Sequence, residues 1–189
     1  MKKINTDALK PFDLIGGRGN AKVSRMIMAI LGGSYTSHTA CFIKHNTRGW
    51  GIGETSPPAS EFIPYKDYED LMNNEGYIVR VWRIKDATDQ ERDTLCKLWQ
   101  HEIDGKPYTK KKMWRLWVFR IINTLPWHIK GHWCTRAIGH CFKAVFPVYR
   151  NPFRKPNGTL KKNETPRTAE NRLVAGILED VTDQIIIDV

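Results

Sequence analysis

The sequence predicts an α+β fold in which a small antiparallel sheet packs against helices. Two β-rich runs, 38–45 and 50–55, flank the polar segment 46–49, which is the pattern of an antiparallel hairpin. Helical periodicity and capping signals follow later in the chain, as an α+β architecture requires. With 189 residues, 41% of them hydrophobic, the chain suits a single domain spanning 1–189 with a substantial core.

The first half of the chain supplies the sheet. A short strand is expected at 12–16, and Asn20 can cap an amphipathic helix at 21–31 that two glycines end. The hairpin comes next. A third strand is expected at 75–84, where β-branched and aromatic residues are enriched.

The second half supplies most of the helices. Thr88 and Glu91 form a capping box ahead of a helix at 92–102, and a turn follows at 104–108. The remaining expected elements are helices at 109–125, 133–145 and 169–178, an exposed loop at 151–166 and a last strand at 184–189.

The positive charge is concentrated in one part of the chain. The net charge is +10, but 106–172 holds 16 lysines and arginines against only Glu164 and Glu170, so this segment is +14 and the remainder is −4. Such a segment is compatible with peptidoglycan or another anionic polymer, with acidic lipid or nucleic acid, and equally with a solvated surface.

Composition also bears on location. The start of the chain lacks the apolar core of a secretory signal, and no apolar run reaches the roughly 18 residues that a transmembrane helix needs. We therefore expect the protein to be cytoplasmic as synthesised. The four cysteines show no repeated pair spacing and are expected to be reduced thiols.

Three residues form a constellation that could carry chemistry. Cys134 opens the helix expected at 133–145, where the helix dipole and unpaired N–H groups favour a thiolate and could bind an oxyanion. His38 begins one strand of the expected hairpin, and Glu54 ends the other, so the carboxylate could orient the imidazole as a general base. Cys41 and Cys96 lie in apolar patterns and are expected to be structural.

Six short motifs follow one another along the chain in this order: FDLIGG, SYTSHTACFI, WGIGETSP, DGKPY, HWCTRAIGHCF and ETPRTAENRL. Together they resemble the circularly permuted papain-like cysteine hydrolases of the NlpC type, which include lecithin:retinol acyltransferase-like enzymes. The resemblance covers most of the chain and implies Cys134 as nucleophile, His38 as base and Glu54 as the orienting residue. The substrate contacts that it implies are Tyr35, Tyr108, Trp133 and Thr135.

The expected function is that of a cysteine hydrolase, which cleaves an amide bond through an acyl-enzyme and without a cofactor. The first candidate substrate is a peptide bond in peptidoglycan. Access to peptidoglycan would then require a phage virion, a lysis system or another route to the host cell envelope. The alternative is the lipid-directed branch, an acyl hydrolase or acyltransferase with the same residues. The basic, Trp-rich insert at 110–130 is longer than the family pattern and leaves the substrate open; within it, 110–122 could contact a membrane peripherally.

Other classes fit the sequence less well. A zinc site is considered because five potential ligands cluster in the sequence: His128, His132, Cys134, His140 and Cys141. Pro126 and Gly131 interrupt the helix that would align the first two, so no metal is expected. A nucleic-acid binder is not favoured because no recognised binding signature occurs, and an inactive structural relative is the remaining alternative.

Overall fold

The computed structural model describes residues 1–19, 36–75, 77–108, 134–147 and 176–189. The helices expected at 21–31 and 109–125, most of the one at 169–178, and the loop at 151–166 lie outside these ranges. Within them the protein is α+β, as the sequence predicts, with an antiparallel sheet and several helices. Among the described helices, none has the length and apolar character needed to cross a membrane.

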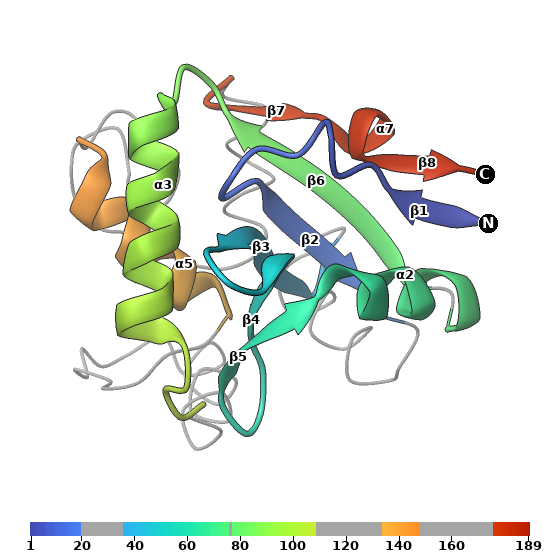
Figure 1. Cartoon of the computed structure of the whole chain (residues 1–189), viewed down its shortest axis with the longest axis horizontal. Helices are drawn as coiled ribbons and strands as arrows, with labels where there is room; N and C mark the ends of the chain where they lie inside the picture. The colour runs from blue at the N-terminus through green and yellow to red at the C-terminus, as the bar shows by residue number, and fades with distance from the viewer. Residues whose placement is uncertain (20–35, 76, 109–133, 148–175) are drawn as a thin grey trace, which may run out of the picture.

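The main sheet has six strands, all antiparallel to their neighbours, in the order β5-β4-β3-β2-β6-β7 (Figure 1). Their bounds are β2 Leu14–Arg18, β3 His38–His45, β4 Gly49–Thr55, β5 Ser60–Pro64, β6 Ile78–Ile84 and β7 Leu178–Asp180. The predicted hairpin is therefore confirmed as β3 and β4, and the strand predicted at 75–84 is β6. The sheet is larger than the sequence suggested, because β5 and β7 carry too little periodicity to be recognised alone.

Helices cover both faces of this sheet (Figure 1). One face carries α3 Asp89–Leu98, the π-helical turn η1 Trp99–Ile103 and α5 Cys134–Val145, and the other carries α2 Tyr65–Asn74. The capping box is confirmed: the Thr88 hydroxyl accepts from the Glu91 N–H, and the Glu91 carboxylate accepts from the Thr88 N–H.

The core is divided into two apolar clusters, one on each face. Because strand side chains alternate, Cys41 and Ile43 of β3 join the cluster beneath α3 and α5, whereas Ala40 and Phe42 join the cluster beneath α2. All four side chains are buried. The central strands therefore have no solvated face over this stretch, and helices on both sides fix their position.

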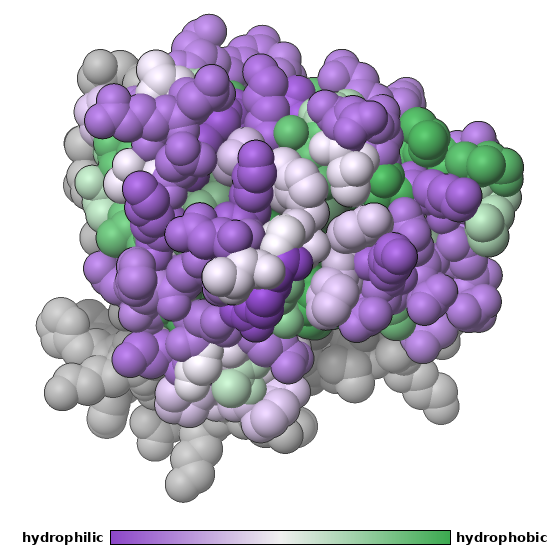
Figure 2. Space-filling model, in the orientation of Figure 1, coloured by the Kyte–Doolittle hydropathy of each residue, from purple (hydrophilic) through white to green (hydrophobic). Residues whose placement is uncertain are grey.

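The chain ends form a separate two-stranded ribbon of β1 Lys2–Ile4 and β8 Ile186–Asp188. The strand predicted at 184–189 is wrong in its first two residues, because Thr182–Ile185 form the short helix α7. The Val181 carbonyl accepts from the Gln184 and Ile185 N–H groups, and the Thr182 carbonyl accepts from the Ile186 N–H. The surface is mainly hydrophilic, with an apolar patch where the ribbon ends (Figure 2). The exposed large apolar residues of the described ranges lie here, namely Met1, Ile187 and Val189.

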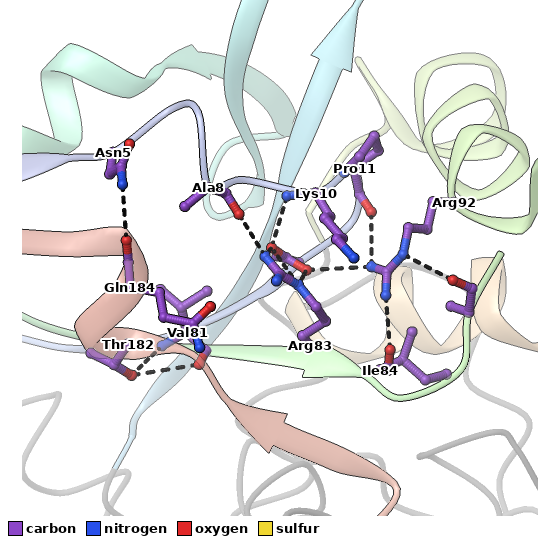
Figure 3. A network of polar contacts seen from close by, with 12 residues as sticks. Asn5, Ala8, Lys10, Pro11, Val81, Arg83, Ile84, Arg92, Thr182 and Gln184 are labelled. Atoms are coloured by element: carbon purple, nitrogen blue, oxygen red, sulfur yellow. Dashed lines mark hydrogen bonds and ion pairs between the residues drawn. The ribbon is translucent and has the colours of Figure 1, made fainter. Parts of the chain in front are cut away.

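A buried ionic cluster ties the start of β2 to β6 and α3. The Asp13 carboxylate, fully buried, accepts from Arg83 Nη2 at 2.5 Å and from Arg92 Nη1 at 3.3 Å. The second guanidinium also donates to the Ile84 carbonyl, and the Lys10 N–H donates to Asp13 (Figure 3). One carboxylate thus neutralises part of two buried positive charges and joins three elements.

Replacing Asp13 with Asn should lower the free energy of unfolding by about 3–5 kcal/mol, because two buried guanidinium groups lose their shared counter-charge. Urea unfolding followed by fluorescence measures the loss. Asp104→Asn is the matched control, since its ion pair with Arg48 lies at the surface and is worth at most about 1 kcal/mol. Equal losses in the two variants would contradict a central role for the buried cluster.

Candidate functional site

The structure brings two of the predicted site residues, His38 and Glu54, together. Cys41 of β3 opposes Gly53 of β4, so the same register sets Ala40 opposite Glu54 and leaves His38 on the diagonal, two residues earlier on the same face. His38 Nε2 lies 3.4 Å from Glu54 Oε1. The two side chains are 20% and 16% exposed, so water screens their interaction only in part.

A third side chain, Tyr68 of α2, completes this polar group. Its hydroxyl donates a hydrogen bond to Glu54 Oε2, the carboxylate oxygen that does not face His38. Burial, followed by the negative charge of Glu54, raises the pKa of Tyr68 well above its usual value, so the phenol stays protonated and remains a donor. The Glu54 carboxylate therefore bridges an imidazole and a phenol.

Sequence reasoning missed Tyr68. Within 65–74 the buried residues Tyr68 and Met72 stand four apart, which is a helical spacing that could have revealed the inner face of α2. No sequence signal indicates that this face lies over β4, because that contact depends on how the chain turns after β5.

Cys134 is the first residue of α5, as the sequence predicts for the start of this helix within one residue. Its side chain lies outside the described part of the structure. The first position of a helix of 12 residues lies near the positive end of the helix dipole, and that position generally favours a thiolate.

The polar pair and α5 occupy different sides of the sheet. His38 shares its face with Ala40 and Phe42, which pack beneath α2, whereas α5 packs on the face of Cys41 and Ile43. Because His38 is the first residue of β3, its ring lies at an end of the sheet. A thiol on α5 could therefore contact the imidazole only by passing that end of the sheet.

The other three cysteines are free and buried. Burial raises the pKa of Cys41 well above its usual value, that of Cys96 to about 11 and that of Cys141 to about 12. Such thiols stay protonated near neutral pH and are poor nucleophiles. They have the structural environment that the sequence predicts for Cys41 and Cys96.

The remaining predicted contacts are only partly described. Tyr108 comes shortly after the turn at 104–105, and its N–H donates to the Pro58 carbonyl at 2.8 Å. Tyr35 and Trp133 lie outside the described residues, as does the side chain of Thr135, whose backbone is in the first turn of α5.

The zinc alternative involves two described side chains, and they point apart. His140 Nε2 lies 2.6 Å from Glu102 Oε2 at the surface, whereas Cys141 is buried in the core. His128 and His132 lie outside the described residues. The described part of the chain holds no group of three or more His, Cys, Asp or Glu side chains that could bind a metal.

Comparison with known proteins gives a likeness in fold. No family model matches the chain, and no curated protein sequence matches it. The crystal structure of the metalloprotein yiiX from Escherichia coli O157:H7 is similar, with a TM-score of 0.60 and 15% sequence identity over 91% of this chain and 96% of that one. At this identity the likeness shows a shared fold and nothing about activity.

Iodoacetamide at about pH 6 should modify Cys134 first and leave the other three cysteines unlabelled, because their raised pKa values and burial keep them as inaccessible thiols. Peptide mapping by mass spectrometry identifies the labelled residue. Unfolding in denaturant before labelling should make all four cysteines react, and native Cys134→Ser should show no labelling. Preferential modification of Cys41 or Cys96 would contradict the assignment.

Proposed function

We propose that this protein is a papain-like thiol hydrolase that cleaves an amide bond through an acyl-enzyme on Cys134. The observation that carries the proposal is the His38–Glu54 pair at the end of two neighbouring strands, in a chain whose α5 begins with a cysteine. An imidazole oriented by a carboxylate, with a cysteine at a helix N-terminus, is the combination that nucleophilic thiol catalysis requires.

The contacts of His38 suggest different roles for its two ring nitrogens. Nε2 faces the Glu54 carboxylate, so Nδ1 is the nitrogen that would exchange a proton with the thiol. The thiolate attacks the carbonyl carbon, the leaving amine takes the proton from the imidazolium, and a thioester forms. Water then attacks the thioester, gives a proton to His38 and releases the acid and the thiol.

Distances along the elements support a meeting of Cys134 and His38. Cys41 of β3 and Cys141 of α5 are buried in the same apolar cluster, which ties α5 to β3 at that level. The seven residues from Cys134 to Cys141 span about 10 Å of helix, and the three from His38 to Cys41 span about 10 Å of strand. When α5 and β3 run in the same direction, Cys134 and His38 therefore lie at the same position along the strand axis.

A peptide bond in peptidoglycan is the substrate that we propose, following the resemblance to NlpC-type hydrolases. The rival is an ester or amide of a lipid acyl chain, which the same three residues could cleave or transfer. The basic insert 110–130, which would distinguish the two, lies outside the described residues.

The name of the structural neighbour raises a metal as another candidate, since yiiX is called a metalloprotein. His38 and Glu54 could supply two ligands, but among the described residues they are not part of a larger ligand group. We propose the thiol mechanism because α5 begins with a cysteine.

His38→Ala should lower kcat/KM on muropeptides by at least about 100-fold, because it removes the general base, and Glu54→Gln should lower it less, because the base remains. Product formation is measured by mass spectrometry. Glu75→Gln is the matched control, since Glu75 lies at the exposed surface at the end of α2. Wild-type turnover by His38→Ala would show that the proposed triad is wrong.

A variant with Lys110, Lys111 and Lys112 changed to Gln tests the lipid rival, because each basic residue near an anionic membrane contributes about 1 kcal/mol of binding. Sedimentation with anionic and with neutral vesicles measures the effect. The peptidoglycan proposal expects weak binding to both kinds of vesicle and no change in the variant. Strong, salt-sensitive binding to anionic vesicles that the substitutions abolish, with small-substrate turnover intact, would favour the lipid branch.

A further inference from the structure

We infer that Tyr68 is a positioning residue, whose hydroxyl holds one oxygen of Glu54 so that the other faces the imidazole of His38. The inference rests on the proposed function in one respect, the role of His38 as a base. It adds a residue that neither the motifs nor the structural likeness indicates, contributed by a helix outside the predicted triad.

Contacts on two sides of α2 hold Tyr68 in position. Its ring makes an edge contact with Tyr77, with centroids 6.1 Å apart. The next residue, Glu69, accepts from the Ile4 N–H at 2.6 Å, and Asn73 accepts from the Lys2 N–H at 2.7 Å. The helix is thus held to β1 on one side while Tyr68 reaches β4 on the other.

Glu54 needs such a partner because its surroundings do not otherwise fix it. Glu61 lies directly opposite on β5, and like charges at opposed positions repel. A carboxylate at a strand end can also rotate about its last bond. A charge-assisted hydrogen bond from a buried, protonated phenol favours one rotation and leaves Oε1 toward His38.

The titratable groups around the pair come from four elements. Glu54 has three titratable neighbours. They are His38 across the hairpin, Tyr68 on α2 and Glu61 on β5. On the β2 side, Gly17 pairs with His38, and a side chain there would lie 1.9 Å from the Tyr77 hydroxyl. Glycine at 17 therefore makes room for a second phenol, that of Tyr77.

The test is Tyr68→Phe, which removes the hydroxyl and keeps the ring. NMR titration of His38 in the whole protein is the readout that a purely structural role would not move. We expect the His38 titration midpoint to move to lower pH, because the imidazolium loses a fixed counter-charge. We expect kcat/KM on muropeptides to fall about tenfold, with the urea unfolding midpoint checking that the fold is retained.

Two further variants sharpen the result. Tyr65→Phe, one turn earlier on α2, removes a phenol hydroxyl but leaves the Tyr68–Glu54 hydrogen bond, and should change neither the midpoint nor kcat/KM. In a Glu54→Gln background, Tyr68→Phe should add less than about a twofold loss, because the carboxylate that it positions is already gone.

Three outcomes would overturn the inference: an unchanged His38 midpoint, a midpoint raised because the hydroxyl only competes for the carboxylate charge, or the same tenfold loss in the Glu54→Gln background. Failure of the proposed function looks different. If His38→Ala stays active while Tyr68→Phe moves the His38 midpoint, the positioning contact stands and the catalytic role of His38 falls.

Discussion

The position of the central strands depends on one buried carboxylate, that of Asp13. Its side chain receives two guanidinium groups, and its backbone carbonyl accepts from the Phe42 N–H of β3. The preceding residue, Phe12, has a φ of 63°, a conformation that costs a non-glycine residue energy and persists only where neighbours enforce it. Because β2 is aligned in this way with β3, β6 and α3, the end of β3 that carries His38 is aligned as well.

The two faces of the sheet differ in the polarity of the residues at their ends. The face under α3 and α5 carries an apolar cluster that contains three thiols, and burial keeps these thiols protonated and unreactive. The face under α2 is apolar until the strands end, where Tyr68, Glu54 and His38 form a chain of polar contacts. Glu54 tolerates partial burial here because its carboxylate accepts from the Tyr68 hydroxyl and lies 3.4 Å from His38 Nε2, and apolar neighbours on the same face restrict the directions in which it can turn.

The sequence was informative where structure is local. The hairpin and the capping box depend on residues a few positions apart, and the His38–Glu54 pair follows from the hairpin register. Tyr68 could not be predicted, because its partner lies 14 residues earlier on another element. β5 was missed since prolines flank it, and Pro64 both closes the strand and precedes α2. The strand at 184–189 was partly wrong because its apolar residues first complete a helical turn.

The double attachment of α2 couples the chain ends to the polar site. Adjacent residues of this helix hold different partners: Tyr68 binds Glu54, whereas Glu69 binds the backbone of β1. A two-stranded ribbon is marginally stable alone, so among the described strands we expect β1 and β8 to open at a lower free energy than those of the six-stranded sheet. Each such opening releases α2 on one side. Hydrogen exchange in the ribbon and the integrity of the site are therefore linked, and warming would impair the site through sub-global opening before the core around Asp13 unfolds.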